Sequence, residues 1–418
     1  MKILLKDATL IDFSNKLHCQ TISLLIEDGI IKNIDKKINV KADVIIDNEN
    51  LHVSRGWWDP SVSFGEPGFE ERETIGNGLN VAAKSGFTSI GLNPDVIPYS
   101  DNYGAITHLI NKSKGYTTNI YPIGCLTESS NGLKMASLND MKKAGAIAFG
   151  DYKFPTENPN LLKTALEYSQ SFNGIISSYP TDKETTRNGM MNEGPTSTML
   201  GVKAYGSYAE TSRVFRDIKI LEHTGGRLHF SLISSKDSID LIEDAKNKGL
   251  NVTCSTSLPH LLFTDENLKD FNSKYKFFPT LKTNEDKLAL RKGLISGVID
   301  CVTAMHEPKN PEIKNLDFYS ASDGSIGLES FFPLLNTLFP IEKTIQFLTR
   351  GKIIFGIDDF EIEVGKSANI SMFNPDKIDV FNKNDILSTS KNCTYLNHKT
   401  KGKVIGSINN GVLSLKQK

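Results

Sequence analysis

Apolar and polar residues follow two different periods along this chain. Near both ends they alternate in short runs, such as "KILLKDATLID" and "TISLLIEDGIIKNI" at the start and "GKVIGSINNGVLSL" at the end. A period of two is typical of strands with one buried face, and Asp28-Gly29 and Asn410-Gly411 are typical hairpin turns. The pattern predicts one small β-sandwich domain made from both ends of the chain, residues 1–52 together with 365–418.

Between these ends, apolar runs rich in β-branched residues alternate with amphipathic segments. The first run lies at Trp57–Ser63, and seven more follow: "GFTSIGLNP", "TNIYPIGCL", "AGAIAFGD", "NGIISSYP", "GRLHFSLIS", "LNVTCSTSL" and "GVIDCVTAMH". Segments between them, such as "KDSIDLIEDAKNKG" and "NEDKLALRKGLISG", have helical periodicity and end in glycine. Eight strand-then-helix units predict a closed α/β barrel, a (β/α)8 TIM barrel, over residues 53–364. An open doubly wound sheet is the alternative, but no GxGxxG follows the first strand.

Composition narrows the class of protein only slightly. The 418 residues include 23% charged side chains and carry a net charge of −1, which favours neither a nucleic acid nor a membrane as partner. No run approaches the ~20 apolar residues of a membrane span, and Met1 leads directly into a predicted strand instead of a signal peptide. Five scattered cysteines without CxxC spacing indicate a reducing cytoplasm and argue against a thiolate zinc site.

Chemistry in such a barrel is expected where the strands end, at the carboxyl rim. The polar or sulfur-bearing residues at these strand ends are Asp59, Ser61, Ser63, Asp151, Ser178, Tyr179, His229, Met305 and His306. A two-metal hydrolytic site needs roughly four or more nitrogen and oxygen ligands per metal and a bridging carboxylate. Serine hydroxyls are weak ligands, and a methionine thioether is unsuited to zinc among hard partners. The rim is therefore poor in metal ligands.

Several motifs, in the same order along the chain, resemble those of class I dihydroorotases of the amidohydrolase superfamily. "DPSVSFGEPGFEERETIGNGLNVAAKSGFTSI" is similar to the family's "DxHVHxREPGxxxKExxxxGxxAAxxGGFTxV". "NEGPTSTMLGVKAYGSYAE" is similar to "NEGxxSxxLGLxGxPxxAE". "LHFSLISSKDSIDLIEDAKNKGLNVTCSTSLPHLLFTDE" is similar to "xHxSTxxSxxLIxxAKxxGxxVTxExxPHHLxLTDE". The resemblance covers essentially the whole chain and implies the same barrel with a small β domain.

Carried over residue by residue, the resemblance implies a degenerate metal site. The paired metal histidines of the family fall on Ser61 and Ser63, and the fifth-strand histidine falls near Ser178 or Tyr179. The catalytic aspartate falls on Met305. Three positions keep the family's residue: Asp151 for the bridging carboxylate, His229 for the sixth-strand histidine, and His306 beside Met305.

The substrate positions are altered in the same direction. The arginine that holds the substrate carboxylate falls on Gly65, and a substrate-binding asparagine falls on Phe278. Asn93 is the candidate for a further asparagine, although that match needs a shift of one residue. Asn93, Asp151, His229 and His306 are thus the candidate pocket residues.

Two functions follow from the resemblance. The first is a catalytically inactive dihydroorotase-like protein, a pseudoenzyme of pyrimidine biosynthesis with no metal, acting as a structural or regulatory partner of aspartate transcarbamoylase and self-associating as a dimer. The second is an active dihydroorotase or related cyclic-amide hydrolase that uses zinc in an unusual site. Under the first, we expect Asp151 and His229 to hydrogen-bond to each other, His306 to be structural, Lys153 not to be a carbamylated metal ligand, and Trp57 and Trp58 to serve packing.

Overall fold

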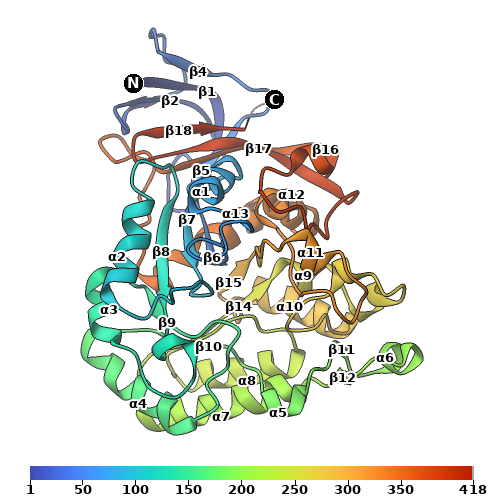
Figure 1. Ribbon diagram of the computed structural model, residues 1–418. Coiled ribbons are helices and arrows are strands. Elements are labelled where there is room, and N and C mark those ends of the chain that lie inside the picture. Colours follow the sequence, from blue (N-terminus) through green and yellow to red (C-terminus); the bar gives the residue numbers. More distant parts are fainter. Residues whose placement is uncertain (417–418) are drawn as a thin grey trace.

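The computed structural model describes residues 1–416 of the chain as two bodies, a sheet domain and a larger α/β barrel (Figure 1). Strands from the start and the end of the sequence lie together in the sheet domain, at the top of Figure 1. The barrel hangs below it and contains the middle of the chain. Among residues 1–416 there is no helix with the length and apolar content of a membrane span.

The sheet domain is hydrogen-bonded in the order β18-β17-β16-β5-β1-β2-β3, with β4 beside the first half of β1. Its strands are β1 (Lys2–Ile11), β2 (Thr21–Glu27), β3 (Ile30–Asp35), β4 (Val44–Ile46), β5 (His52–Arg55), β16 (Ile370–Val380), β17 (Lys399–Asn409) and β18 (Val412–Leu415). Leu5 and Leu24 from one half share an apolar core with Ile370 and Ile408 from the other, as a sandwich requires. Asp28-Gly29 and Asn410-Gly411 form the two hairpin turns, in the left-handed backbone region that such turns need.

Eight parallel strands form the barrel, and each is one of the predicted apolar runs. They are β6 (Trp57–Val62), β7 (Phe87–Leu92), β8 (Asn119–Gly124), β9 (Ala148–Phe149), β10 (Ile176–Ser178), β13 (Leu228–Phe230), β14 (Val252–Ser257) and β15 (Cys301–Thr303). A parallel bridge between Val62 and His306 brings the last strand against the first. The predicted TIM barrel is confirmed.

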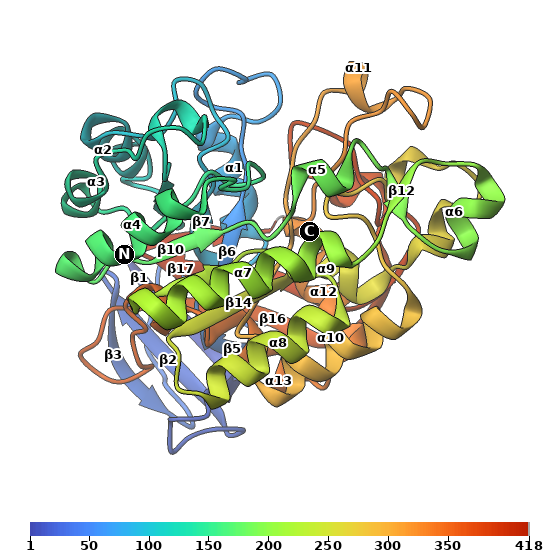
Figure 2. The same ribbon diagram turned by 90° about the horizontal axis from the view of Figure 1, so that it is seen from below.

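Helices cover the outside of the barrel, and Figure 2 shows α7, α8 and α10 side by side along one flank. The longer helices are α1 (Ile75–Lys84), α2 (Tyr103–Lys112), α3 (Leu138–Ala144), α4 (Pro159–Ser169), α7 (Tyr208–Thr224), α8 (Lys236–Asn247), α10 (Asn284–Ser296), α12 (Leu328–Leu338) and α13 (Ile341–Thr349). The shorter ones are α5 (Lys183–Thr186), α6 (Pro195–Leu200), α9 (Leu258–Leu262), α11 (Pro311–Lys314) and α14 (Lys352–Phe355). Gly145 and Gly297 end α3 and α10 in the left-handed conformation, as the sequence predicts.

The foot of the barrel, where the strands begin, packs against the sheet domain. Trp57 starts β6 there and is fully buried. Its ring stacks on Phe332 of α12 with centroids 4.6 Å apart and tilts against Phe373 of β16 at 5.4 Å. Its indole Nε1–H donates to Ser54 Oγ at 2.9 Å, so the polar edge is also satisfied. Trp58 is equally buried in a neighbouring cluster, and the predicted packing role of both tryptophans is confirmed.

Candidate functional site at the barrel mouth

The end of β6 is joined to the end of β7 by one small polar network. Ser61 Oγ donates to Asn93 Oδ1 at 3.1 Å, and Asn93 Nδ2 donates to Ser63 Oγ at 3.1 Å. One asparagine therefore bridges the two serines, which face the same neighbour as the two-residue spacing predicts. All three side chains are buried. The hydroxyls are thus engaged with an amide and are not free donors turned to an ion.

Asp59, two residues before Ser61, is held below this network. Its carboxylate accepts from the Ser61 backbone amide at 3.0 Å, from Thr303 Oγ1 at 2.6 Å and from the Ala304 amide at 2.9 Å. Complete burial raises the pKa of Asp59 to about 7, although these three donors act in the opposite direction. The residue ties β6 to β15, and its bonds are all structural.

Asp151 and His229 are both at the mouth, but the hydrogen bond expected between them is absent from the described residues, so that prediction is wrong. Asp151 instead accepts from the Thr127 amide at 3.0 Å and from Thr127 Oγ1 at 2.6 Å. The two nitrogens of His229 contact Thr253 Oγ1 at 2.9 Å and Ser255 Oγ at 2.8 Å. Asp151 and His229 thus have their hydrogen-bonding capacity met by threonine and serine hydroxyls on neighbouring segments, and need no bond to each other.

Burial shifts the pKa values of Asp151 and His229 in the directions that favour their neutral forms. Burial raises the pKa of Asp151, against the opposing effect of the Thr127 hydroxyl and amide. Burial, together with the charge of Lys246, lowers the pKa of His229 to about 3. His229 is therefore neutral near pH 7, and both of its ring nitrogens are hydrogen-bonded to hydroxyl groups, one of which would have to be displaced before the imidazole could bind a metal or accept a proton.

His306 and Met305 close the barrel. Met305 is buried with a φ of 55°, and the amide of Met305 donates to Thr303 Oγ1 at 3.0 Å. The carbonyl of His306 accepts from the Ser63 amide at 2.9 Å, and its Nδ1 accepts from the Gly327 amide at 3.1 Å. These bonds fit the structural role predicted for His306. Its Nε2 is the exception, because this buried atom has no hydrogen-bond partner in the described chain.

The fifth strand contributes aromatic bulk where a metal histidine was sought. Ser178 Oγ donates to Asp217 at 2.6 Å, away from the other candidates. The Tyr179 ring stacks on Phe278 with centroids 5.7 Å apart and meets Tyr152 edge-on at 6.5 Å. Tyr205 lies edge-on to Phe278 at 6.3 Å. We call Tyr152, Tyr179, Tyr205 and Phe278 the aromatic layer; it fills space at the mouth with apolar surface.

A charged group beside this layer was not predicted. Glu307 is buried and accepts from Lys153 Nζ at 2.6 Å and from Tyr152 Oη at 2.6 Å. Burial alone would raise its pKa, but the charges of Lys153 and Lys309 outweigh burial and lower it. The Lys153 ammonium group is thus engaged in an ion pair with Glu307. The sequence did contain a signal, because Glu307 follows His306 directly in the strand-end motif "AMHEPK".

Asp95 is the second missed carboxylate. Burial raises its pKa to about 6, while Ser63 and the charge of Lys309 act in the opposite direction. It follows β7 by three residues in "LNPD", a strand-end position like that of the other candidates. Asp95 therefore lies beside Ser63, and its Oδ1 has no hydrogen-bond partner among the described residues.

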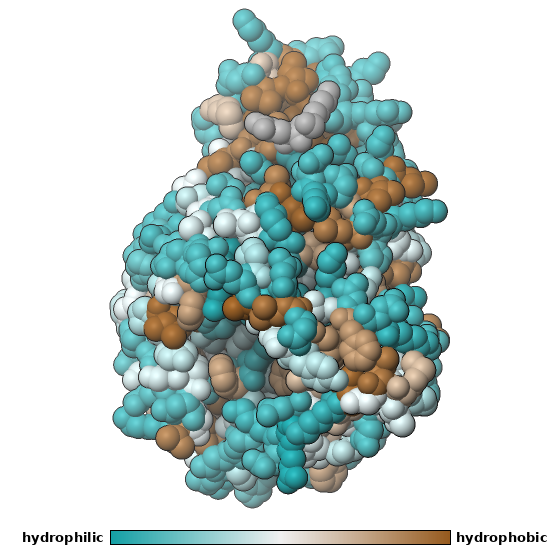
Figure 3. Space-filling model, turned by 45° about the vertical axis from the view of Figure 1, so that its right-hand side comes forward, coloured by the Kyte–Doolittle hydropathy of each residue, from teal (hydrophilic) through white to brown (hydrophobic). Residues whose placement is uncertain are grey.

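Little open space remains between these groups. A cavity of about 20 Å³ lies among Ser61, Asn93, His229 and Ser255, which is room for about one water molecule. A second pocket of about 460 Å³ opens on the other side of Phe278 and is bordered by Lys153, Lys183 and Asp323. The larger body is hollowed on the face drawn in Figure 3, where hydrophilic and hydrophobic residues alternate around the opening.

The donor set does not fit a two-zinc centre. Within residues 1–416, the mouth brings no three histidine, cysteine, aspartate or glutamate donor atoms within 4.8 Å of one another. A catalytic zinc takes about three protein ligands, and a two-metal site needs a shared carboxylate besides. Asp151 and His229, the two ligand positions that the resemblance gives as retained, are each hydrogen-bonded to neighbouring hydroxyl groups. No catalytic step through a metal can be derived for this mouth.

The class of protein that the structure defines is a (β/α)8 barrel with an attached sheet domain. Solved structures share this fold: L-hydantoinase from Arthrobacter aurescens superposes with a TM-score of 0.85 at 17% identity, covering 99% of this chain and 96% of that one. Dihydropyrimidinase from Brevibacillus agri gives a TM-score of 0.83 at 18% identity, covering 100% and 95%.

Sequence comparison gives the family. The model of the dihydro-orotase-like family matches residues 53–238. A protein named dihydroorotase from Acetivibrio thermocellus is 36% identical over 95% of both chains, and one from Pelotomaculum thermopropionicum is 33% identical over 96% of both. The chain belongs to the dihydroorotase family.

Proposed function

We propose that this chain is a catalytically inactive member of the dihydroorotase family that serves pyrimidine biosynthesis as a structural or regulatory protein. The observation that supports this proposal is the saturation of the mouth. Ser61, Ser63 and Asn93 bond to each other, while Asp151 and His229 bond to hydroxyl groups of their own neighbours. Without an activated metal-bound water, the pKa of water stays near ~15.7, and a cyclic amide is not opened by the family's route.

The aromatic layer supports the same proposal from the side of the substrate. Phe278 and Tyr179 stack where an anionic ring would need cationic or amide partners. Gly65 cannot supply the missing cation, and a side chain there would meet the Phe69 carbonyl oxygen. Lys153 is paired with Glu307. Lys282 Nζ lies 4.7 Å from the Tyr205 ring centroid and has no hydrogen-bond partner among the described residues. Apart from Lys282, the aromatic layer offers a carboxylate substrate little compensation for its lost hydration.

An active dihydroorotase is the second candidate, and the names of the relatives favour it. Proteins that are 36% and 33% identical over nearly the full length are called dihydroorotase. In that case Asp151, His229 and His306 would have to exchange their present hydrogen bonds for a zinc ion or a substrate. The unpartnered Nε2 of His306 is the one atom among them that needs no exchange.

Metal analysis combined with a dihydroorotate assay separates the two candidates. The protein is purified from zinc-supplemented medium and assayed in both directions, with the Acetivibrio thermocellus relative as positive control. We expect less than stoichiometric zinc and no turnover above background. Stoichiometric zinc together with turnover would instead establish the enzyme.

A partnership with aspartate transcarbamoylase is the role we propose for the inactive protein, and self-association as a dimer goes with it. Fold retained without chemistry is consistent with a scaffold, because fold and function are separable. Light scattering of the chain alone, and of the chain mixed with the aspartate transcarbamoylase of the same organism, tests both parts. A monomer, or a mixture whose components elute independently, would contradict them.

A further inference from the structure

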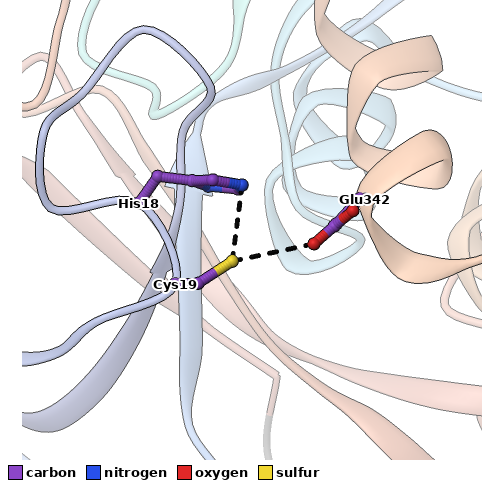
Figure 4. Close-up of side chains that lie close together, drawn as sticks. All are labelled: His18, Cys19 and Glu342. Atoms are coloured by element: carbon purple, nitrogen blue, oxygen red, sulfur yellow. Dashed lines mark hydrogen bonds between the residues drawn. The ribbon is translucent and has the colours of Figure 1, made fainter.

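Outside the mouth, three potential metal donors converge on the side of the molecule where the β1–β2 loop meets the barrel. His18 Nε2 lies 3.3 Å from Cys19 Sγ, and Cys19 Sγ lies 3.7 Å from Glu342 Oε1. Figure 4 shows Cys19 between the other two side chains, with Glu342 reaching over from the helix. Among the described residues this is the one group of three such donors within 4.8 Å of one another.

These separations match those of a zinc or cobalt ion with mixed ligands. At metal distances of about 2.0–2.1 Å for nitrogen and oxygen and about 2.3 Å for sulfur, tetrahedral ligand atoms stand roughly 3.4–3.6 Å apart. The two measured separations, 3.3 and 3.7 Å, bracket that value. Small side-chain adjustments would therefore seat one ion, with water at the fourth position. Cys19 and Glu342 are exposed, so an ion has a path to the site.

The backbone holds two of these donors in place. The His18 amide donates to the Asn15 carbonyl at 3.1 Å, and the Cys19 amide donates to the Leu10 carbonyl at 2.7 Å. Cys19 has a φ of 62°, an unusual conformation for a non-glycine residue that turns its side chain toward the helix side of the loop. Glu342 lies in the first turn of α13, where the helix dipole favours an ionised carboxylate.

We propose that His18, Cys19 and Glu342 form a binding site for a divalent transition-metal ion that links the sheet domain to α13 of the barrel. On binding, the Cys19 thiol loses its proton to solvent and the sulfur coordinates as thiolate. The Asp12 amide now donates to His18 Nδ1 at 3.2 Å, so Nε2 carries the imidazole proton. That proton moves to Nδ1 when Nε2 coordinates, at the cost of the Asp12 hydrogen bond. The net result is one proton released per ion.

This proposal is independent of the proposed function, and it departs from the expectation that the scattered cysteines form no thiolate site. His18 and Cys19 are adjacent in sequence, and Glu342 lies more than 300 positions away. Rules based on the spacing of cysteines and histidines do not detect such a combination.

Cobalt titration of the purified, metal-stripped chain tests the site. Co²⁺ bound to thiolate gives a sulfur-to-metal charge-transfer band in the near ultraviolet. Cys125, Cys254, Cys301 and Cys393 are buried, so the band reports on Cys19. We expect one equivalent of Co²⁺ to produce the band, excess Zn²⁺ to abolish it, and Cys19→Ser to eliminate it.

The other two ligands distinguish a built site from a lone surface thiol. We expect His18→Asn and Glu342→Gln each to weaken Co²⁺ binding at least tenfold, while the exposed controls His108→Asn and Glu312→Gln bind as the parent does. Zn²⁺ should raise the melting temperature of the parent and leave that of Cys19→Ser unchanged, because it binds the folded form. Absence of the band at one equivalent, or unchanged affinity in His18→Asn and Glu342→Gln, would overturn the proposal.

Discussion

The two ends of the barrel differ in the kind of contact that their side chains make. At the foot, Trp57, Phe332 and Phe373 keep a tightly packed apolar contact with the sheet domain. At the mouth, Ser61, Ser63 and Asn93 bond to one another. The foot needs only volume and shape, which many apolar residues supply. A metal centre needs particular donor atoms at fixed positions, so a few substitutions at the mouth could remove it and leave the barrel standing.

The largest change in stability should come from removing the buried indole at the foot of the barrel. Trp57→Ala removes a fully buried indole and its bond to Ser54, and we expect the free energy of unfolding to fall by about 3–5 kcal/mol. Denaturant unfolding followed by circular dichroism measures this loss. Tyr103→Ala, at a residue 54% exposed, is the matched control and should change little. A similar loss in both variants would contradict the special role of the foot.

Lowering the pH should reduce the stability of the protein through the buried His229 at the mouth. Because the pKa of His229 is lowered from 6.5 to about 3, the unfolded chain takes up a proton below about pH 6.5 that the folded chain refuses. The free energy of unfolding then falls by about 1.4 kcal/mol per pH unit from this residue as pH decreases from 6.5. His229→Gln should lack this component, so its stability difference from the parent should change with pH.

The contribution of Asp59 to stability changes with pH in the opposite direction to that of His229. For this reason the test compares the parent with His229→Gln and does not use the parent alone. Its pKa is raised to about 7, so its contribution is present at low pH and is lost as pH rises from about 4 to 7. The variant and the parent share Asp59, and its effect cancels in their difference. A stability difference independent of pH between 4.5 and 6.5 would show that His229 is protonated in the folded state.

A smaller loss is expected from the charged group beside the aromatic layer. Tyr152→Phe removes the hydroxyl that donates to Glu307, and we expect a loss of about 1.5–3 kcal/mol, since bonds to charged groups are the stronger ones. Tyr168→Phe, at a residue 42% exposed, is the control for removing a tyrosine hydroxyl. Equal stability of parent and Tyr152→Phe would mean that Lys153 alone satisfies Glu307.

The smallest effect should follow from partial repair of the mouth. Ser61→His combined with Ser63→His restores two ligand types, yet we expect no dihydroorotate turnover with added zinc. By the resemblance, Met305 still stands in place of the catalytic aspartate, and Ser178 or Tyr179 in place of the fifth-strand histidine. Any zinc-dependent hydrolysis by the double variant would show that these two losses are not decisive.

The sequence predicted the frame of this protein better than the contacts inside it. All eight barrel strands were predicted, because the apolar runs alternate with amphipathic segments, several of which end in glycine. The same periodicity placed Ser61, Asp151, His229 and Met305 at the mouth. Their partners could not be predicted, since the hydroxyls of Thr127 and Thr253 come from segments whose approach depends on tertiary packing. For this reason the expected Asp151–His229 bond was wrong.

Glu307 and Asp95 were missed for a related reason. Both follow strand ends, but the resemblance directed attention to their neighbours. Glu307 is distinguished by its burial, and burial of a carboxylate is not visible in a linear pattern. Position in a motif therefore predicted where chemistry could occur, and packing decided which groups are engaged.

The pairing of β5 with β16 has a consequence for synthesis on the ribosome. Val53 meets Met372 in this pair, so its partner emerges more than 300 residues later. All eight barrel strands have been synthesised before β16, so the barrel can form while the edge of β5 that pairs with β16 is still unpaired. A nascent chain arrested before residue 370 would expose that edge to other chains, so aggregation through the edge is a risk from the emergence of β5 until β16 has been made.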